Sequence, residues 1–146
     1  MCNGLLLPIV VVDQVYSFDR DALIKAIPRP DKTTAKDFAP AAQELFDRIL
    51  QIADNAGSTE EHRALNYLAM RYQAIYAQAA QYFAQNFALS AVNVQPSTLG
   101  GIRKVFDVIF TYTNRSTDVD DMCFVRVDVT DQFPFLVTKL SPYYPR

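Results

Sequence analysis

Few residues in this chain have the types and spacing that catalysis requires. His62 is the only imidazole, so a Ser-His-Asp or Cys-His device would have to use it as the general base. It falls in the first turn of an expected helix, beside Glu61 and Arg63, where a solvated side chain is the more ordinary interpretation. No Gly-x-Ser-x-Gly sequence is present, so a hydrolase of that type is not supported.

The chain also lacks the ligand patterns of common metal sites. A zinc site usually combines several Cys, His or carboxylate ligands, with cysteines close together. Cys2 and Cys123 are far apart, and we expect both to be reduced thiols. The acidic run of Asp118, Asp120 and Asp121 lacks the central glycine and the full ligand set of a calcium loop. We therefore predict no metal and no cofactor.

Asp107 and Asp128 are the strongest candidates for acid–base chemistry. They occur on two neighbouring expected strands, and Asp131 follows shortly afterwards. Buried carboxylates that lie close together titrate abnormally, so a carboxylate-dependent enzyme is one hypothesis. Because no further catalytic group accompanies them, we expect the chain not to be an enzyme.

Charge and hydropathy argue against nucleic acid and membrane partners. The net charge is −2 and no run of Lys or Arg occurs, so nothing would neutralise a phosphate backbone. The apolar run over residues 5–12 is interrupted by Pro8 and is too short to span a bilayer. It also lacks the preceding basic residues of a signal peptide, which predicts a cytoplasmic protein.

The elements that must position these residues begin with a long expected helix over residues 58–87. Ser58 and Glu61 form a capping box, and apolar residues recur behind them at helical spacing without Gly or Pro. A second helix is expected over residues 38–56, and Gly57 terminates it. The short connection predicts that the two helices form an antiparallel hairpin.

A small, mainly antiparallel sheet completes the expected fold. Alternating apolar residues predict strands over residues 102–113 and 122–130, and we add strands over residues 5–12 and 135–140. Residues 89–94 are expected to be a short extended segment only. The result is an α+β fold in which the helical hairpin packs on the sheet, and residues 1–146 form a single domain.

Several short stretches together resemble a known family. The most specific is Arg-Ala-Leu-Asn-Tyr over residues 63–67. The others are Val-Tyr-Ser-Phe over residues 15–18, Phe-Asp-Val over residues 106–108 and Val-Asp-Val-Thr-Asp over residues 127–131. They resemble the C-terminal domain of unknown function in PatA/PatG-type maturation proteases of cyanobactin biosynthesis. The residues that match the family pattern, and hence the candidate interaction residues, are Tyr16, Arg63, Asn66, Tyr67, Asp107, Asp128 and Asp131.

The resemblance implies a function but not a chemistry. Domains of this type follow a subtilisin-like protease or macrocyclase in pathways that make ribosomal cyclic peptides. A non-catalytic accessory module is implied, for assembly or for binding the precursor peptide, with a protein or peptide as partner.

The chain departs from the family pattern in two places. Family members begin well upstream, so we expect this chain to lack the N-terminal part of the family domain. They also tend to carry a close pair of cysteines before the aromatic-Asp-Val strand, whereas residues 94–105 contain none. No metal site is therefore carried over from the family.

A self-associating structural domain is the alternative hypothesis. An incomplete sheet would leave an open edge at the strand over residues 5–12, and open edges favour pairing with another chain. A homodimer would be the result.

Overall fold

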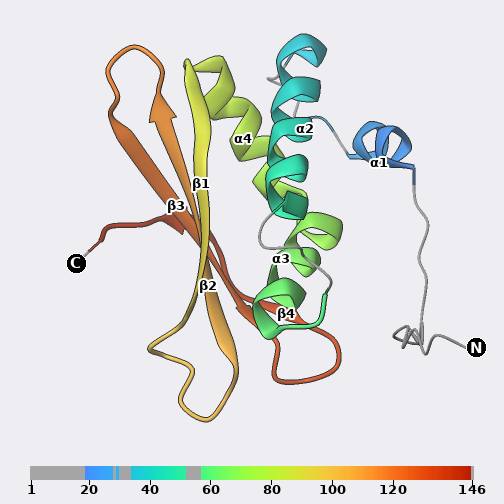
Figure 1. Ribbon diagram of the computed structural model, residues 1–146, viewed down its shortest axis with the longest axis vertical. Coiled ribbons are helices and arrows are strands. Elements are labelled where there is room, and N and C mark those ends of the chain that lie inside the picture. The colour runs from blue at the N-terminus through green and yellow to red at the C-terminus, as the bar shows by residue number, and fades with distance from the viewer. Residues whose placement is uncertain (1–18, 28, 30–33, 52–56, 146) are drawn as a thin grey trace, which may run out of the picture.

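Helices and strands segregate into two layers in the computed structural model, which describes residues 19–27, 29, 34–51 and 57–145. The elements found there are α1 (Arg20–Ala26), α2 (Ala35–Gln51), α3 (Glu60–Arg71), α4 (Ala74–Ala84), β1 (Phe87–Pro96), β2 (Val105–Asn114), β3 (Asp120–Asp128) and β4 (Phe135–Pro142). The helices lie on one side of the sheet (Figure 1). The expected α+β fold class is confirmed.

The helical hairpin is present, but its second arm is not one helix. α2 begins at Ala35, three residues earlier than expected, and the end predicted at residues 52–56 lies outside the described residues. α2 runs antiparallel to α3 and α4 (Figure 1). The continuous helix predicted over residues 58–87 is wrong, because it is divided into α3 and α4. Among the described helices, none is both long and apolar enough to cross a bilayer.

The division between α3 and α4 occurs at Tyr72, whose backbone leaves the helical region with φ −114° and ψ 86°. A break of this kind deprives the carbonyl of Ala69 of its helical N–H partner. The hydroxyl of Tyr76 donates a hydrogen bond of 2.8 Å to that carbonyl instead. The break is therefore satisfied internally by a side chain one turn further on.

The start of α3 also differs from the expected capping box. Thr59, not Ser58, is the N-cap residue, and its hydroxyl accepts a hydrogen bond of 3.2 Å from the N–H of His62. Glu60 and Glu61 occupy the first turn, where the helix dipole favours negative charge. The helix therefore has a hydroxyl N-cap, as predicted, but the cap is Thr59, one residue later than predicted.

The sheet has four antiparallel strands in the order β1-β2-β3-β4 among the described residues. The predicted hairpin of β2 and β3 is confirmed, and β4 extends the predicted last strand by two residues. β1 was predicted only as a short extended segment, whereas it is a full ten-residue strand of the sheet. The strand predicted over residues 5–12 lies outside the described residues.

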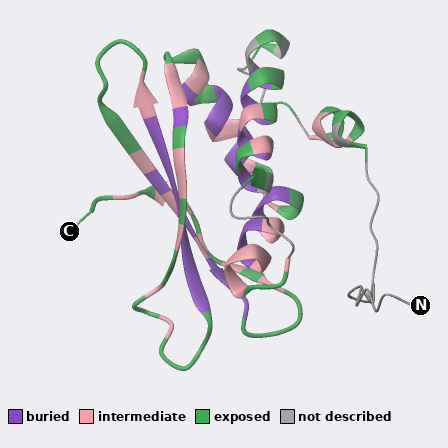
Figure 2. Cartoon of the chain, viewed as in Figure 1, coloured by how far each residue is buried: buried purple, intermediate pink, exposed green. Residues whose placement is uncertain are grey.

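The core lies between the helices and the two central strands. Figure 2 shows buried residues along the facing sides of both layers. Fully buried large side chains include Leu45, Phe46, Ile49, Leu65, Leu68, Ile75, Tyr76, Val108, Phe110, Val125 and Val127. The other face of β2 is buried as well. Asp107 is among the residues on that second face.

Candidate functional site

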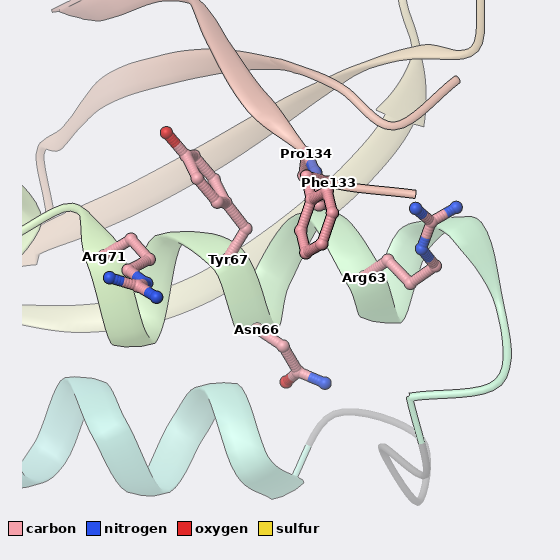
Figure 3. A pocket seen from close by; sticks show the side chains of 6 residues that line it. All are labelled: Arg63, Asn66, Tyr67, Arg71, Phe133 and Pro134. Carbon is pink, nitrogen blue, oxygen red and sulfur yellow. The ribbon is translucent and has the colours of Figure 1, made fainter. Parts of the chain in front are cut away.

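Three of the candidate residues share one face of α3. Arg63 and Tyr67 are four residues apart and Asn66 is three residues from Arg63, so the helix brings them together. Arg71, which was not among the predicted site residues, continues the same row four residues beyond Tyr67. Figure 3 shows Arg63 and Arg71 toward opposite ends of this face, with Tyr67 between them.

Arg63 connects α3 to the loop between β3 and β4. Its Nη1 donates to the carbonyl of Val129 at 3.0 Å, and its Nη2 donates to the carbonyls of Asp131 and Gln132 at 2.5 and 3.0 Å. These acceptors are neutral carbonyls, so they do not offset the positive charge of the guanidinium, which lies beside the groove described below. The side chain therefore positions the loop and also contributes charge.

Asp128 holds the same loop from its other side. Its carboxylate accepts a hydrogen bond of 2.5 Å from Arg103 Nε and one of 2.9 Å from the backbone N–H of Thr130. The bond from Arg103 is the main reason why the pKa of Asp128 falls from 3.8 to about 2. Asp128 is therefore an anion at neutral pH, and its carboxylate is paired with Arg103 within the protein.

Asp131 adds a weaker contact to this arrangement. Its carboxylate lies 3.4 Å from Nη2 of Arg103 and is largely exposed. The backbone N–H of Lys104 also donates to the hydroxyl of Thr130 at 2.8 Å, which ties the loop to the start of β2. Three of the candidate residues, Arg63, Asp128 and Asp131, thus converge on one loop.

The loop places Phe133 and Pro134 beside α3, and an open groove of about 550 Å³ lies between the loop and the helix. It is lined by Arg63, Asn66, Tyr67, Arg71, Phe133 and Pro134 (Figure 3). Phe133 is 79% exposed, so its apolar surface is open to a ligand in the groove. None of the described residues that line the groove is acidic. It presents two cations, a phenol, an amide and an exposed ring.

Asp107 belongs to a separate site on the sheet face that points away from the helices. Arg126, directly opposite on β3, donates to its two carboxylate oxygens at 2.6 and 3.0 Å. This bidentate geometry is the strong form of an arginine–carboxylate pair. Asp107 and Asp128 are both buried but each is paired with its own arginine. The sequence suggested a carboxylate pair, and the structure contains two arginine–carboxylate pairs.

The remaining chemical candidates do not assemble into a site. Tyr16 and Cys2 lie outside the described residues. Cys123 is buried, and burial raises the pKa of its thiol to about 12. Asp120 and Asp121 accept hydrogen bonds from Thr113 at 2.5 Å and from Tyr82 at 2.7 Å. In the described part of the chain, no three His, Cys, Asp or Glu residues lie close enough to hold a metal ion.

Comparison with known proteins decides the family. The family model described as PatG C-terminal matches residues 32–143. The chain belongs to the PatG C-terminal family. A solved structure of a PatG domain of unknown function superposes with a TM-score of 0.66 at 19% sequence identity, covering 88% of this chain and 50% of that one. The chain therefore spans about half the length of that structure, and a search of curated proteins gives no match.

The family resemblance seen in the sequence is thus confirmed. Of the residues that line the groove, the sequence predicted Arg63, Asn66 and Tyr67 but not the others. Arg71 could have been found from the helical spacing that joins Arg63 and Tyr67. Phe133 and Arg103 could not, because they lie on two different loops, β3–β4 and β1–β2, whose paths the sequence does not reveal. In this PatG C-terminal domain, the helix supplies one wall of the groove and the loop supplies the other.

Proposed function

We propose that this PatG C-terminal domain is a non-catalytic accessory module in the maturation of ribosomal cyclic peptides of the cyanobactin type. Its task is to bind a peptide segment that carries a carboxylate, in the groove between α3 and the β3–β4 loop. Family membership supports the pathway. The charge and shape of the groove support the ligand.

The single observation that carries the proposal is the charge of Arg71, which no described residue pairs with, beside an exposed aromatic ring. None of the ion pairs among the described residues involves Arg71, and no carboxylate lines the groove. An arginine fork and a planar ring together suit an acidic side chain, or a free C-terminus, next to an apolar one. Arg63 and the Tyr67 hydroxyl offer further donors.

The same geometry supports a binding role over a catalytic one. Asp107 and Asp128 are held by arginines, and a carboxylate with a pKa near 2 is a weak general base. The donors that remain in the groove are cationic or neutral, which suits recognition of an anion. A carboxylate-dependent enzyme, the rival hypothesis from the sequence, has less support.

Fluorescence anisotropy with labelled peptides tests the proposal on the full chain. The probe is a short peptide in which Asp alternates with Leu, and the comparison peptide has Asn in place of Asp. We expect the Asp peptide to bind more tightly by about tenfold, the effect of a charge-assisted hydrogen bond. Equal binding of the two peptides would contradict the proposed ligand.

Two arginine variants locate the binding. Arg71→Gln should remove most of the preference for the Asp peptide. Arg115→Gln is the matched control, because Arg115 is exposed and lies over the ring of Phe83, away from the groove. If the two variants behaved alike, the effect would be one of net charge alone. Cleavage or cyclisation of a precursor peptide by the isolated chain above background would contradict the non-catalytic role.

A further inference from the structure

The outer edge of β1 has backbone groups that are available for pairing with another strand. This strand ends the sheet on one side, because the strand order among the described residues is β1-β2-β3-β4. An edge strand presents backbone N–H and C=O groups that no neighbouring strand uses. Which of these groups face outward follows from the register with β2.

Two hydrogen bonds fix the phase of the β1–β2 ladder. The N–H of Ser97 donates to the carbonyl of Val105 at 2.8 Å, and the Ser90 hydroxyl donates to the carbonyl of Thr111 at 3.1 Å. The odd-numbered residues of β2 therefore direct their backbone groups toward β1. In an antiparallel pair, residues that exchange hydrogen bonds alternate with residues whose groups point away.

The register then assigns the outward groups. Asn93 and Gln95 lie opposite odd-numbered residues of β2 and bond to them, whereas Val92 and Val94 lie opposite Phe110 and Val108. The backbone N–H and C=O of both valines consequently point away from the sheet. Pro96 has the same phase, and a proline, which has no N–H, is tolerated at an outward position.

The free stretch of this edge is short and bounded. At one end, Arg48 Nη2 from α2 donates to the carbonyl of Leu89 at 3.4 Å. At the other end, Pro96 cannot donate. On the opposite edge of the sheet, the N–H of Leu140 in β4 is satisfied by the hydroxyl of Tyr72 at 3.1 Å. Between these two ends of β1, the outward backbone groups to which the described residues give no partner are those of Val92 and Val94.

A groove of about 340 Å³ follows this free stretch and is closed on its far side by the start of α3. Its lining residues are Thr59, Glu61, His62, Leu65, Val92, Asn93 and Val94. Leu65 and the two valines are apolar, while Glu61 supplies a negative charge. No ion pair among the described residues involves Glu61.

His62 gives an independent sign that the groove is incomplete. Its Nδ1 is the one buried side-chain nitrogen or oxygen of the described residues that has no hydrogen-bond partner. A buried polar atom without a partner is unfavourable, and native structures contain few of them. His62 also lines the groove, so the groove contains a described residue whose hydrogen bonding is incomplete.

We propose that the β1 edge binds an extended peptide as a fifth strand, pairing with Val92 and Val94. Apolar side chains of the peptide pack on Leu65 and the two valines, and a Lys or Arg side chain faces Glu61. Main-chain hydrogen bonds supply affinity in this mode of recognition, and alternate side chains supply specificity. The site goes beyond the proposed function, because it uses the helical face of α3 opposite to Arg63 and Tyr67.

Hydrogen exchange of backbone amides tests the pairing directly. In the free chain, the amides of Val92 and Val94 should exchange fast, while those of Asn93 and Gln95 should be protected. The probe is a capped heptapeptide that begins with Thr, in which Thr alternates with Val and the central Val is replaced by Lys, so that the Lys lies on the same side of the strand as the other two valines. At a tenfold excess of this peptide over its Kd, exchange at both valines should slow by about tenfold. Unchanged exchange at both valines under binding conditions would overturn the proposal.

Peptides with N-methylated backbones provide a second measurement that needs no protein variant. Along an extended chain, successive N–H groups point to opposite sides. Methylating alternate residues in one phase blocks every N–H that faces β1, and the opposite phase leaves them free. We expect only one phase to abolish binding. Equal loss in both phases, or in neither, would exclude strand addition.

Charge recognition is tested with two adjacent glutamates. Glu61→Gln should weaken binding of the Lys peptide by about two- to fivefold, the range of an exposed ion pair. Glu60→Gln is the matched control, because Glu60 lies in the same turn but pairs with Lys104. Valine protection that rose with protein concentration in the absence of peptide would overturn the proposal in favour of a second copy of the chain.

Discussion

At the scale of single residues, the β3–β4 loop depends on a few polar side chains that the family pattern also contains. Arg63 reaches the loop from α3 and meets three backbone carbonyls. Asp128 reaches it from the end of β3 and accepts the N–H of Thr130. Because loop carbonyls and N–H groups are satisfied from both sides, the loop that carries Phe133 has a defined position. Binding in the groove therefore depends on residues that need not touch the ligand.

The planar fork of Arg63 should matter more than its charge. Arg63→Lys keeps the positive charge but cannot reach three carbonyls at once, so we expect a loss of about 1–2 kcal/mol in the free energy of unfolding. Arg71→Lys, on the same helical face without such contacts, should change it by less than about 0.5 kcal/mol. Urea denaturation measures both. Equal losses would show that the carbonyl contacts contribute little.

Asp128 should make the stability of the domain depend on pH in the acid range. Its pKa in the folded protein is about 2, below the ordinary 3.8, so folding favours the charged form. The resulting stabilisation is fully present above pH 3.8 and is lost as the pH falls toward about 2. Asp128→Asn should flatten the dependence of the free energy of unfolding on pH in that window.

Asp131→Asn is the control for this measurement, since Asp131 is largely exposed and lies 3.4 Å from the same arginine. An exposed ion pair contributes little, so this variant should retain most of the acid-range dependence. Acid titrations that follow parallel curves for wild type and Asp128→Asn would contradict the role assigned to Asp128.

At the scale of elements, the break between α3 and α4 shows where sequence patterns lose information. The stretch contains neither Gly nor Pro, and its apolar residues keep helical spacing, so a single helix was the natural prediction. The break is stabilised by tertiary contacts instead. The hydroxyl of Tyr76 satisfies the Ala69 carbonyl, and Tyr72 reaches β4. Neither contact is visible in a local pattern.

Removing the Tyr72 hydroxyl should release the β4 edge. In Tyr72→Phe the N–H of Leu140 loses its acceptor, so its amide should exchange faster and the free energy of unfolding should fall by about 1 kcal/mol. Tyr67→Phe is a fair control, since the Tyr67 hydroxyl makes no hydrogen bond to another described residue. If Leu140 exchanged equally fast in both variants, the contact would have no part in protecting the edge.

β1 was largely missed because an irregularity interrupts its alternation. The register with β2 shifts between Leu89 and Ala91, so Leu89 faces the core and, after the shift, so do Val92 and Val94. The apolar residues before and after the shift therefore differ in phase, and a period of two does not extend across it. β2 and β3 keep an unbroken alternation, and both were predicted within three residues of their ends.

The same contrast applies to the candidate site. Helical spacing alone placed Arg63, Asn66 and Tyr67 on one face, because the geometry of a helix is local. The pairing of Asp107 with Arg126 follows from strand register, which sequence alternation constrains only to the correct face. Phe133 depends on a loop, and no periodic pattern extends to it.

At the scale of the whole molecule, the helices and the sheet share one core. Buried residues of α2, α3 and α4 pack with those of β2 and β3 in a single cluster. Tyr82 of α4 stacks on Tyr112 of β2 with ring centroids 4.2 Å apart, so an aromatic contact reports on the junction between the layers. The chain contains no tryptophan, which leaves tyrosine as the natural optical probe of this contact.

A shared core implies that the two layers unfold together. Leu68 lies in α3 and Val125 in β3, and both are fully buried. Leu68→Ala should lower the free energy of unfolding by about 2–5 kcal/mol, and Val125→Ala by about 2 kcal/mol. Met70→Ala, at a half-exposed position of α3, should have an effect of less than about 1 kcal/mol.

The decisive measurement compares two signals in the same denaturant titration. Far-ultraviolet circular dichroism is dominated by the helices, and near-ultraviolet circular dichroism of tyrosine follows tertiary packing, which includes the contact between α4 and β2. A single cooperative unit requires both midpoints to coincide in the wild type and to shift together in each core variant. If Leu68→Ala shifted only the helical signal, α3 would unfold separately from the sheet. The groove between α3 and the β3–β4 loop would then open before the rest of the domain, and its ligand would stabilise only the helical signal.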